Sequence, residues 1–453
     1  MEMQLLRNLV LFGSHELLLM FFSACGEGDL AALYKDRQTV VASASAVSMV
    51  DQYSHISNKQ SRLGLSGLSV LDAANSVYWP RTDHQVAQAD SKLRIFAGQK
   101  GLALAAGSQE QSALRSPTVS HLKTVPIWIG HDELRGLKME GEAWLQLKAR
   151  AKQPAGTPNL SDPRQKNNVY VLAKALVYAR CSLETEHDQC RDISVDGLRN
   201  EVIDQVMRAI GTEGNSTLAL GRELAAYVIS ADLLGLPVAM DLKFRDWLAN
   251  VRHKNIRGRT LISTHEDRPN NWGTHAGASR VAVAVYLNDI EDLHRAAKVF
   301  KGYLGDRMSY AGFRYGKDLS WQCSPDKPVG INPAGCARQG HSIDGVLPDD
   351  QRRCGSFGWP ACLTNYAWEG LQGAIVQAVI LNRAGYDVFT WNNRALLRAY
   401  KWLYIEGGNP AKGDDSWQLA LVDRFYGTNF WDGRKTRPGK NIGWTDWTHP
   451  PTN

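Results

Sequence analysis

A short stretch in the middle of the chain gathers side chains suited to binding and proton transfer. Residues 270–280 read Asn-Asn-Trp-Gly-Thr-His-Ala-Gly-Ala-Ser-Arg, where a polar loop gives way to a helical pattern. Asn271 and His275 are four residues apart, so on a helix both side chains project from one face. Two amides and an imidazole in one segment predict a functional site. Arg280 lies further into the helix, and we expect it to be structural.

A second polar cluster follows later in the chain. Residues 344–353 read Asp-Gly-Val-Leu-Pro-Asp-Asp-Gln-Arg-Arg, and residues 362–369 read Cys-Leu-Thr-Asn-Tyr-Ala-Trp-Glu. His341 stands just before the first run, and Trp359 stands between the two. Tyr366 opens a segment with an apolar helical stripe. Guanidinium groups, a phenol and further carboxylates thus join the amides and imidazole of the first cluster.

The order of these motifs resembles the alginate lyase superfamily of polysaccharide lyases. The shared order is N-N-[aromatic], then D-G-x-x-P-x-x-x-R-R, then N-Y-A-x-E-x-L, then A-G-Y-D-V-F, and it covers roughly residues 125–403. The resemblance implies an incomplete (α/α) toroid with a substrate groove and β-elimination at a 4-linked uronic acid residue. Removing the proton at C5 creates enolate charge beside a carboxylate, which close donors must neutralise.

The resemblance also implies roles for four residue positions. Asn271 would contact the carboxylate, Arg353 (or Arg352) would neutralise it or favour the tyrosinate, and Tyr366 would be the acid or the acid and base. Amides and guanidinium groups suit this because they donate hydrogen bonds without competing for the proton. A tyrosine can act as acid or base, particularly where nearby cations lower its pKa.

The base is open, because this sequence departs from the family pattern. A histidine directly follows the paired asparagines in the better-known alginate lyases, whereas Trp272 occupies that place here. His275, His341 and Tyr366 itself therefore compete for the role, and a neutral imidazole with a pKa near ~6.5 would serve. We expect five further residues to bind substrate: Asn270, Trp272, His341, Arg352 and Trp359. The two tryptophans would stack against sugar rings.

Each of these residues also has a structural reading. Asn270 and Asn271 suit a helix N-cap, His275 suits a buried structural position, and Arg352 and Arg353 can pair with Asp349 and Asp350. Two other functions also stay open. A glycoside hydrolase would need two carboxylates across the bond, for which Asp344, Asp350 and Glu369 are available, although nearby arginines would hold them ionised. A non-catalytic glycan-binding lipoprotein would need the tryptophans but not Tyr366.

Helical periodicity dominates the chain after residue 126 and predicts an all-α fold of helical hairpins. The expected helices cover residues 142–151, 168–180, 196–210, 217–234, 244–250, 276–286, 293–303, 368–384 and 394–404. Residues 309–363 interrupt the series with glycines, prolines and cysteines. A loop of this length is usually functional, and it could cover a cleft.

The cysteines indicate an oxidising compartment. Apart from Cys25, six cysteines fall in close pairs at residues 181 and 190, 323 and 336, and 354 and 362. Sequence does not fix their connectivity, but the spacing favours three local disulfides, which persist in the periplasm or outside the cell. The spacing does not suit a zinc site. We therefore expect no metal and no cofactor.

The first 25 residues read as an export signal, with a possible lipid anchor at Cys25. Residues 26–120 show no readable fold, so we take residues 121–453 as the lyase domain and expect a periplasmic, outer-membrane-anchored or secreted monomer. The net charge of +6 and the pI near 8.8 suit a polyanionic partner. Because no nucleic-acid-binding motif accompanies the basic clusters, we expect an acidic polysaccharide and no nucleic acid.

Overall fold

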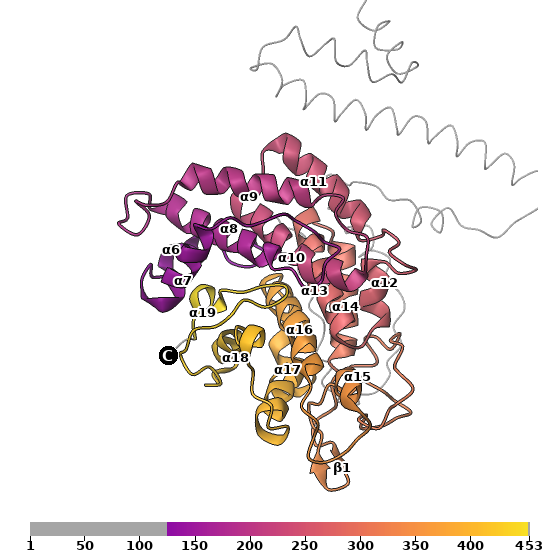
Figure 1. Ribbon diagram of the computed structural model, residues 1–453. Helices are drawn as coiled ribbons and strands as arrows, with labels where there is room; N and C mark the ends of the chain where they lie inside the picture. The colour runs from indigo at the N-terminus through magenta and orange to yellow at the C-terminus, as the bar shows by residue number, and fades with distance from the viewer. Residues whose placement is uncertain (1–124, 452–453) are drawn as a thin grey trace, which may run out of the picture. The chain divides into compact units, whose positions relative to one another are not determined.

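The computed structural model describes residues 125–451, and this part of the chain is mostly helical (Figure 1). The predicted export signal, Cys25 and the segment 26–120 lie outside the described residues. The strands are β1 (Ala337–Arg338) and β2 (His341–Ser342), which pair antiparallel. The helices are α6 (His131–Gly136), α7 (Gly141–Ala151), α8 (Asn167–Leu183), α9 (Val195–Ala209), α10 (Thr217–Leu234), α11 (Val238–Val251), α12 (Leu261–Asp267), α13 (Asn271–Leu287), α14 (Ile290–Tyr303), α15 (Pro348–Gln351), α16 (Asn365–Arg383), α17 (Trp391–Lys401), α18 (Gln418–Tyr426) and α19 (Thr445–Thr448). The all-α prediction is confirmed.

Helix α13 lies between α10 and α16 at very short range. A Cβ atom at Gly221 of α10 would lie 2.8 Å from the backbone nitrogen of Ala276, and one at Gly373 of α16 would lie 2.3 Å from the carbonyl carbon of Thr274. Glycine is the residue that permits such an approach of two backbones. The two glycines therefore set the spacing of three adjacent helices.

The same three helices run in the same direction. Along α10 and α13, Gly221 meets Ala276, and further on the Ala225 N–H donates to the Ser279 hydroxyl at 3.0 Å. Along α13 and α16, Thr274 meets Gly373, and Gly277 meets Gln377 one turn later. Contacts that advance together along both partners require parallel helices. The N-terminal ends of α10, α13 and α16 consequently lie at one end of this row.

Two helices begin five or more residues before their predicted starts. Helix α13 begins at Asn271 rather than at residue 276, because Asn270 caps it and accepts a hydrogen bond from the Trp272 N–H at 3.1 Å. Helix α11 begins at Val238, directly after Pro237, rather than at residue 244. A proline is well suited to the start of a helix, because its missing N–H is not needed there.

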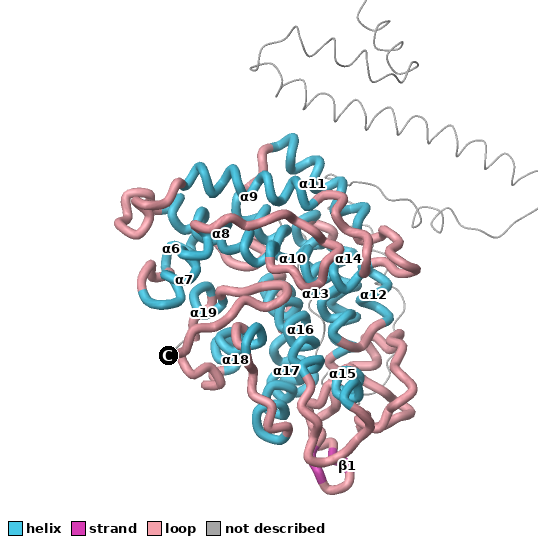
Figure 2. The backbone as a smooth tube through the Cα atoms, viewed as in Figure 1, coloured by secondary structure: helices cyan, strands magenta, loops and turns pink. Residues whose placement is uncertain are grey.

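The long segment between α14 and α16 is mostly loop (Figure 2) and is held from within by buried Asn332. The Asn332 side-chain amide donates to the carbonyl oxygens of Trp321 at 2.9 Å and Ile343 at 3.1 Å. The short helix α15 lies within this segment. The internal hydrogen bonds fix the path of the loop to α15, which carries the second predicted polar cluster.

The three predicted disulfides are confirmed, as Cys181–Cys190, Cys323–Cys336 and Cys354–Cys362. Disulfides of this kind are typical of proteins outside the reducing cytosol. Within residues 125–451, none of the helices combines the length and the apolar character that crossing a membrane requires.

Candidate active site

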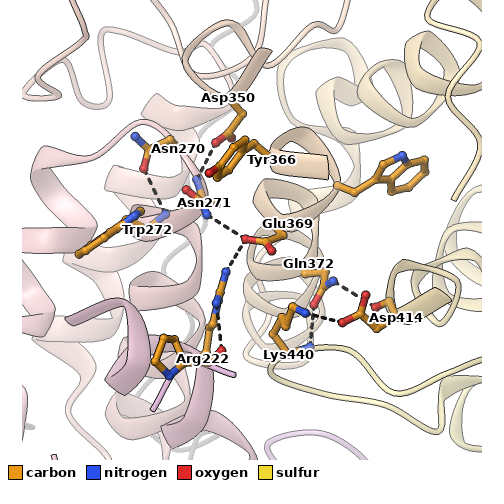
Figure 3. Close-up of polar contacts among 12 residues, drawn as sticks. Arg222, Asn270, Asn271, Trp272, Asp350, Tyr366, Glu369, Gln372, Asp414 and Lys440 are labelled. Carbon is orange, nitrogen blue, oxygen red and sulfur yellow. Dashed lines mark hydrogen bonds and ion pairs between the residues drawn. The ribbon is translucent and has the colours of Figure 1, made fainter. Parts of the chain in front are cut away.

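The two polar clusters predicted from the sequence meet at the start of α13. The Asn270 side-chain amide donates to Asp349 Oδ2 at 2.7 Å, and the Asn271 backbone N–H donates to Asp350 Oδ1 at 3.1 Å. Figure 3 shows Asp350 and Tyr366 next to Asn271. The loop that holds α15 thus docks onto the N-terminal end of α13 through two neighbouring carboxylates.

Asn270 and Arg352 support this docking contact. Both hydrogen-bonding groups of the buried Asn270 side chain are engaged, one with the Trp272 N–H and one with Asp349. Arg352 Nε donates to the other Asp349 oxygen at 2.6 Å. For these two residues, which we expected to bind substrate, the contacts fit the structural reading instead.

Asn271 is held by a carboxylate shared with a third helix. Its side-chain nitrogen donates to Glu369 Oε2 at 3.0 Å, and the same oxygen pairs with the Arg222 guanidinium. The Asn271 side-chain oxygen has no partner within residues 125–451. Because an amide nitrogen carries two hydrogens, Glu369 fixes the orientation of the amide and leaves one N–H without a hydrogen bond within residues 125–451, on a residue that is only 1% exposed.

Tyr366 and Arg353 form an exposed pair above this layer. The Arg353 guanidinium carbon lies 4.2 Å from the centroid of the Tyr366 ring, an attractive cation–π arrangement. The Tyr366 side chain stands in the first turn of α16, where Thr364 caps the helix, and the residue is 38% exposed. The phenol is therefore accessible to a large ligand, with a cation against its ring.

A second arginine, which the sequence did not single out, lies in the same neighbourhood. The Arg268 guanidinium carbon is 5.5 Å from the centroid of the Trp272 ring, and Arg268 Nε has no hydrogen-bond partner among the described residues. Burial lowers the pKa of Arg268 and the charge of Arg259 lowers it further, whereas the charges of Asp349 and Asp267 raise it. Arg268 forms no ion pair within residues 125–451, so its guanidinium group could attract an anion.

His275 does not fit the role of base. Its ring is completely buried, and neither nitrogen has a partner within the described part of the chain. Burial lowers the pKa of His275 well below its usual value, and the charges of Arg222 and Lys440 act in the same direction. The prediction placed His275 beside Asn271 on one helix face, but that face is covered by α10 and α16.

His341 and Trp359 form a stacked pair in the long loop. Their ring centroids are 4.4 Å apart and the rings are nearly parallel, at 10°. His341 lies on β2, and Trp359 lies in the loop closed by the Cys354–Cys362 disulfide. One face of Trp359 is thus covered by the imidazole, and one face of Trp272 is similarly approached by Arg268. Each tryptophan has at most its other face for a sugar.

Asp350 is protonated more readily than an ordinary aspartate. Burial raises the pKa of Asp350 well above its usual value, and the charges of Asp349 and Glu369 add to this, against the hydrogen bond from the Asn271 N–H. Its free oxygen faces α16, where a Cβ atom at Gly370 would lie 2.4 Å away. The expectation that arginines hold Asp350 ionised is therefore wrong, because burial dominates.

The C-terminal tail adds a further group of polar side chains. The Lys440 backbone N–H donates to Gln372 Oε1 at 2.8 Å, one helical turn after Glu369 on α16, and the Lys440 side chain pairs with Asp414 (Figure 3). Asp414 also pairs with Lys166. Sequence inspection missed this group, because its members come from three distant segments and none forms a motif. Residues 125–451 contain no group of His, Cys, Asp or Glu side chains placed to hold a metal ion.

Comparison with models of protein families, with curated proteins and with solved structures finds no match to this chain.

Proposed function

We propose that the protein is a polysaccharide lyase that cleaves a 1,4-linked polyuronate, alginate or glucuronan, by β-elimination. The observation that carries the proposal is the exposed Tyr366 phenol with the Arg353 guanidinium against its ring, beside the amide of Asn271. This arrangement supplies a proton-transfer group and carboxylate-binding donors together. The product would be a chain with an unsaturated uronate at its new end.

The substrate carboxylate would lie among Arg353, Arg268 and the free N–H of Asn271. Within residues 125–451, neither guanidinium group has a carboxylate partner, so both could neutralise the substrate carboxylate and stabilise the enolate charge as the C5 proton leaves. Glu369 would act through Asn271, because it fixes the amide and is itself held by Arg222. The buried His275 would take no part in proton transfer.

Tyr366 would carry out both proton transfers. As tyrosinate it would take the proton from C5; the C5–H electrons would form the C4=C5 double bond, and the C4–O4 bond would break. The phenol would then return the proton to O4 of the leaving chain. One residue can do this when both groups leave from the same face of the ring. The distant His341, stacked on Trp359, is the competing base.

Several observations support the wider proposal. The parallel row of α10, α13 and α16, with the site at its N-terminal end, agrees with an incomplete (α/α) toroid. The three disulfides agree with export to the periplasm, the outer membrane or the medium. The net charge of +6 agrees with an acidic polysaccharide as partner. We expect the enzyme to act as a monomer without a cofactor.

The test is incubation with alginate, glucuronan and hyaluronan, followed by absorbance near ~235 nm, where the unsaturated uronate absorbs. The proposal requires a rising signal on at least one 1,4-linked polyuronate, and loss of that signal in Tyr366→Phe. Release of reducing ends without any absorbance would exclude elimination.

A glycoside hydrolase is the second candidate, favoured by one observation. Burial raises the pKa of Asp350, whereas its neighbour Glu369 is ion-paired with Arg222, and hydrolysis needs two carboxylates in unlike environments. Against it, Asp350 is completely buried and its free oxygen faces Gly370. The absorbance assay separates the two reactions, because hydrolysis leaves no double bond.

A further inference from the structure

The C-terminal part of the chain contains a pocket that the proposed active site does not use. Its volume is about 500 Å³, and it lies among residues 404–419 and 430–437. This size is within the range of small-molecule sites, roughly 300–1,000 Å³. It would accommodate one or two sugar rings.

One side of the pocket is aromatic and held in place. Tyr404 and Phe430 stack with centroids 4.6 Å apart, and the Trp431 indole N–H donates to the Arg434 carbonyl oxygen at 2.7 Å. The Trp431 backbone N–H is also bound, by Asp423 at 2.8 Å. Burial raises the pKa of Tyr404 to about 12, so its phenol stays neutral. Fixed aromatic faces suit the apolar faces of a pyranose ring.

The lining of the pocket also contains basic side chains. Lys412 and Arg437 line it, both residues are exposed, and neither side chain forms an ion pair within residues 125–451. Arg434 and Lys435 also line it and pair only with exposed carboxylates, of Asp432 at 3.4 Å and Glu142 at 3.7 Å. The lining therefore combines aromatic rings with four basic side chains against the single carboxylate of Asp432, which suits a ligand that is both anionic and flat-faced.

Polar contacts of the tail segment lie both at this pocket and near the candidate active site. Ser416 lines the pocket and accepts a hydrogen bond from the Arg437 N–H at 3.1 Å. Nearby Asp414 accepts a hydrogen bond from Lys440 and offers its carbonyl oxygen to Gln372 at 3.1 Å. Gln372 stands one helical turn beyond Glu369, and Figure 3 shows these side chains side by side. The pocket and the active site thus flank the same tail segment.

We propose that this pocket is a remote subsite that binds a uronate residue of the same acidic polysaccharide, away from the bond that is cleaved. This inference rests on the proposed function for the identity of the polymer, but not for the existence of the site. The aromatic side would contact the ring, and Lys412 and Arg437 would bind the carboxylate. The subsite would favour long chains over short ones.

The test measures binding of a saturated 1,4-linked uronate octamer by calorimetry in the Tyr366→Phe background, where no elimination is expected. The double variant Lys412→Ala/Arg437→Ala removes only side chains without a hydrogen-bond partner in the described residues. We expect its affinity to fall about tenfold, since that corresponds to the loss of about one charged contact. Trp431→Ala should weaken binding comparably, and circular dichroism checks its folding.

The matched control is Lys243→Ala/Arg257→Ala, which removes the same charge from exposed positions elsewhere. Its affinity should change less than about twofold, because exposed distant charges are screened. Equal affinities in the pocket and control variants would overturn the proposal, as would equal binding of a neutral glucan octamer or of adenosine monophosphate. If the pocket variants bind the octamer more weakly but the unsubstituted protein gives no signal at ~235 nm, the pocket proposal stands and the lyase function is excluded. If the pocket variants bind normally and the unsubstituted protein gives the signal, the lyase function stands and the pocket proposal is excluded.

Discussion

The carboxylate of Glu369 on α16 accepts a hydrogen bond from the side-chain amide of Asn271 on α13 at 3.0 Å. The same oxygen pairs with Arg222 on α10, so one atom joins three parallel helices at the end where the candidate site lies. This contact ties the orientation of a proposed carboxylate-binding residue to the packing of the fold.

Replacing Glu369 by alanine should destabilise the protein. The Arg222 side chain is largely buried, and it would lose its only carboxylate partner in the described residues. Breaking such a pair costs roughly 3 kcal/mol, which urea unfolding would measure. The control is Asp204→Ala, which breaks the exposed Arg208–Asp204 pair and should cost less than about 0.5 kcal/mol. Similar losses in both variants would contradict the structural role of Glu369.

Replacing Tyr366 by phenylalanine should abolish elimination while leaving stability unchanged. The lost hydroxyl is the proposed proton-transfer group, so kcat should fall by at least ~10²-fold. Tyr170→Phe is a matched control, because the Arg150 guanidinium carbon lies 3.7 Å from the Tyr170 ring centroid in a similar pair away from the site. Full activity of the Tyr366 variant at normal thermal stability would move the proton transfers to another residue.

Arg352 and Arg353 should behave differently despite their adjacency. Arg353→Ala should raise KM or lower kcat by about tenfold or more, since a charge-assisted contact to substrate is worth roughly 1.5–3 kcal/mol, with little effect on unfolding. Arg352→Ala should instead lower the free energy of unfolding by roughly 1–3 kcal/mol, because it removes a partner of the buried Asp349. Kinetics and urea unfolding on both variants would show whether the two effects separate in this way.

The buried imidazole of His275 should make stability fall in acid. Its pKa is lowered by burial in the folded state, so only the unfolded chain binds a proton as pH drops below about 6.5. Stability is therefore present above this pH and decreases below it, by up to roughly 1.4 kcal/mol per pH unit for one group. His275→Gln should reduce this slope between about pH 6 and 5.

The control for that measurement is His253→Gln, at an exposed position. Its slope should match the unsubstituted protein. An unchanged slope in His275→Gln would mean that the imidazole gains access to protons in the folded state, and its role as base would need to be reconsidered.

Replacing Gly373 by alanine should push α13 and α16 apart. The added methyl group would lie 2.3 Å from the Thr274 carbonyl carbon, and neither backbone can move without disturbing the site. Overpacking of this kind costs roughly 1–3 kcal/mol. Gly136→Ala provides the comparison, because nothing lies within 4 Å of its Cβ position and its cost should be near zero. Equal thermal stability of both variants would contradict the close packing.

The sequence predicted the helical class, the three disulfides and the meeting of the two polar clusters. Periodic apolar residues and paired cysteines are local signals, and they were sufficient to predict the helical class and the disulfides. The sequence left open whether His275 is catalytic or buried and structural, because its burial depends on Gly221 and Gly373 in two other helices. Arg268 and Lys440 likewise carry no motif, and only the folded chain brings them to the site.

The parallel direction of α10, α13 and α16 has an electrostatic consequence. Each helix carries a partial positive charge, equivalent to roughly half an elementary charge, at its N-terminal end. Three such ends at the candidate site add a field from backbone dipoles to the field of the arginines. No proton can neutralise a backbone dipole, so attraction of a polyanion should weaken with salt but persist at any pH at which the protein remains folded.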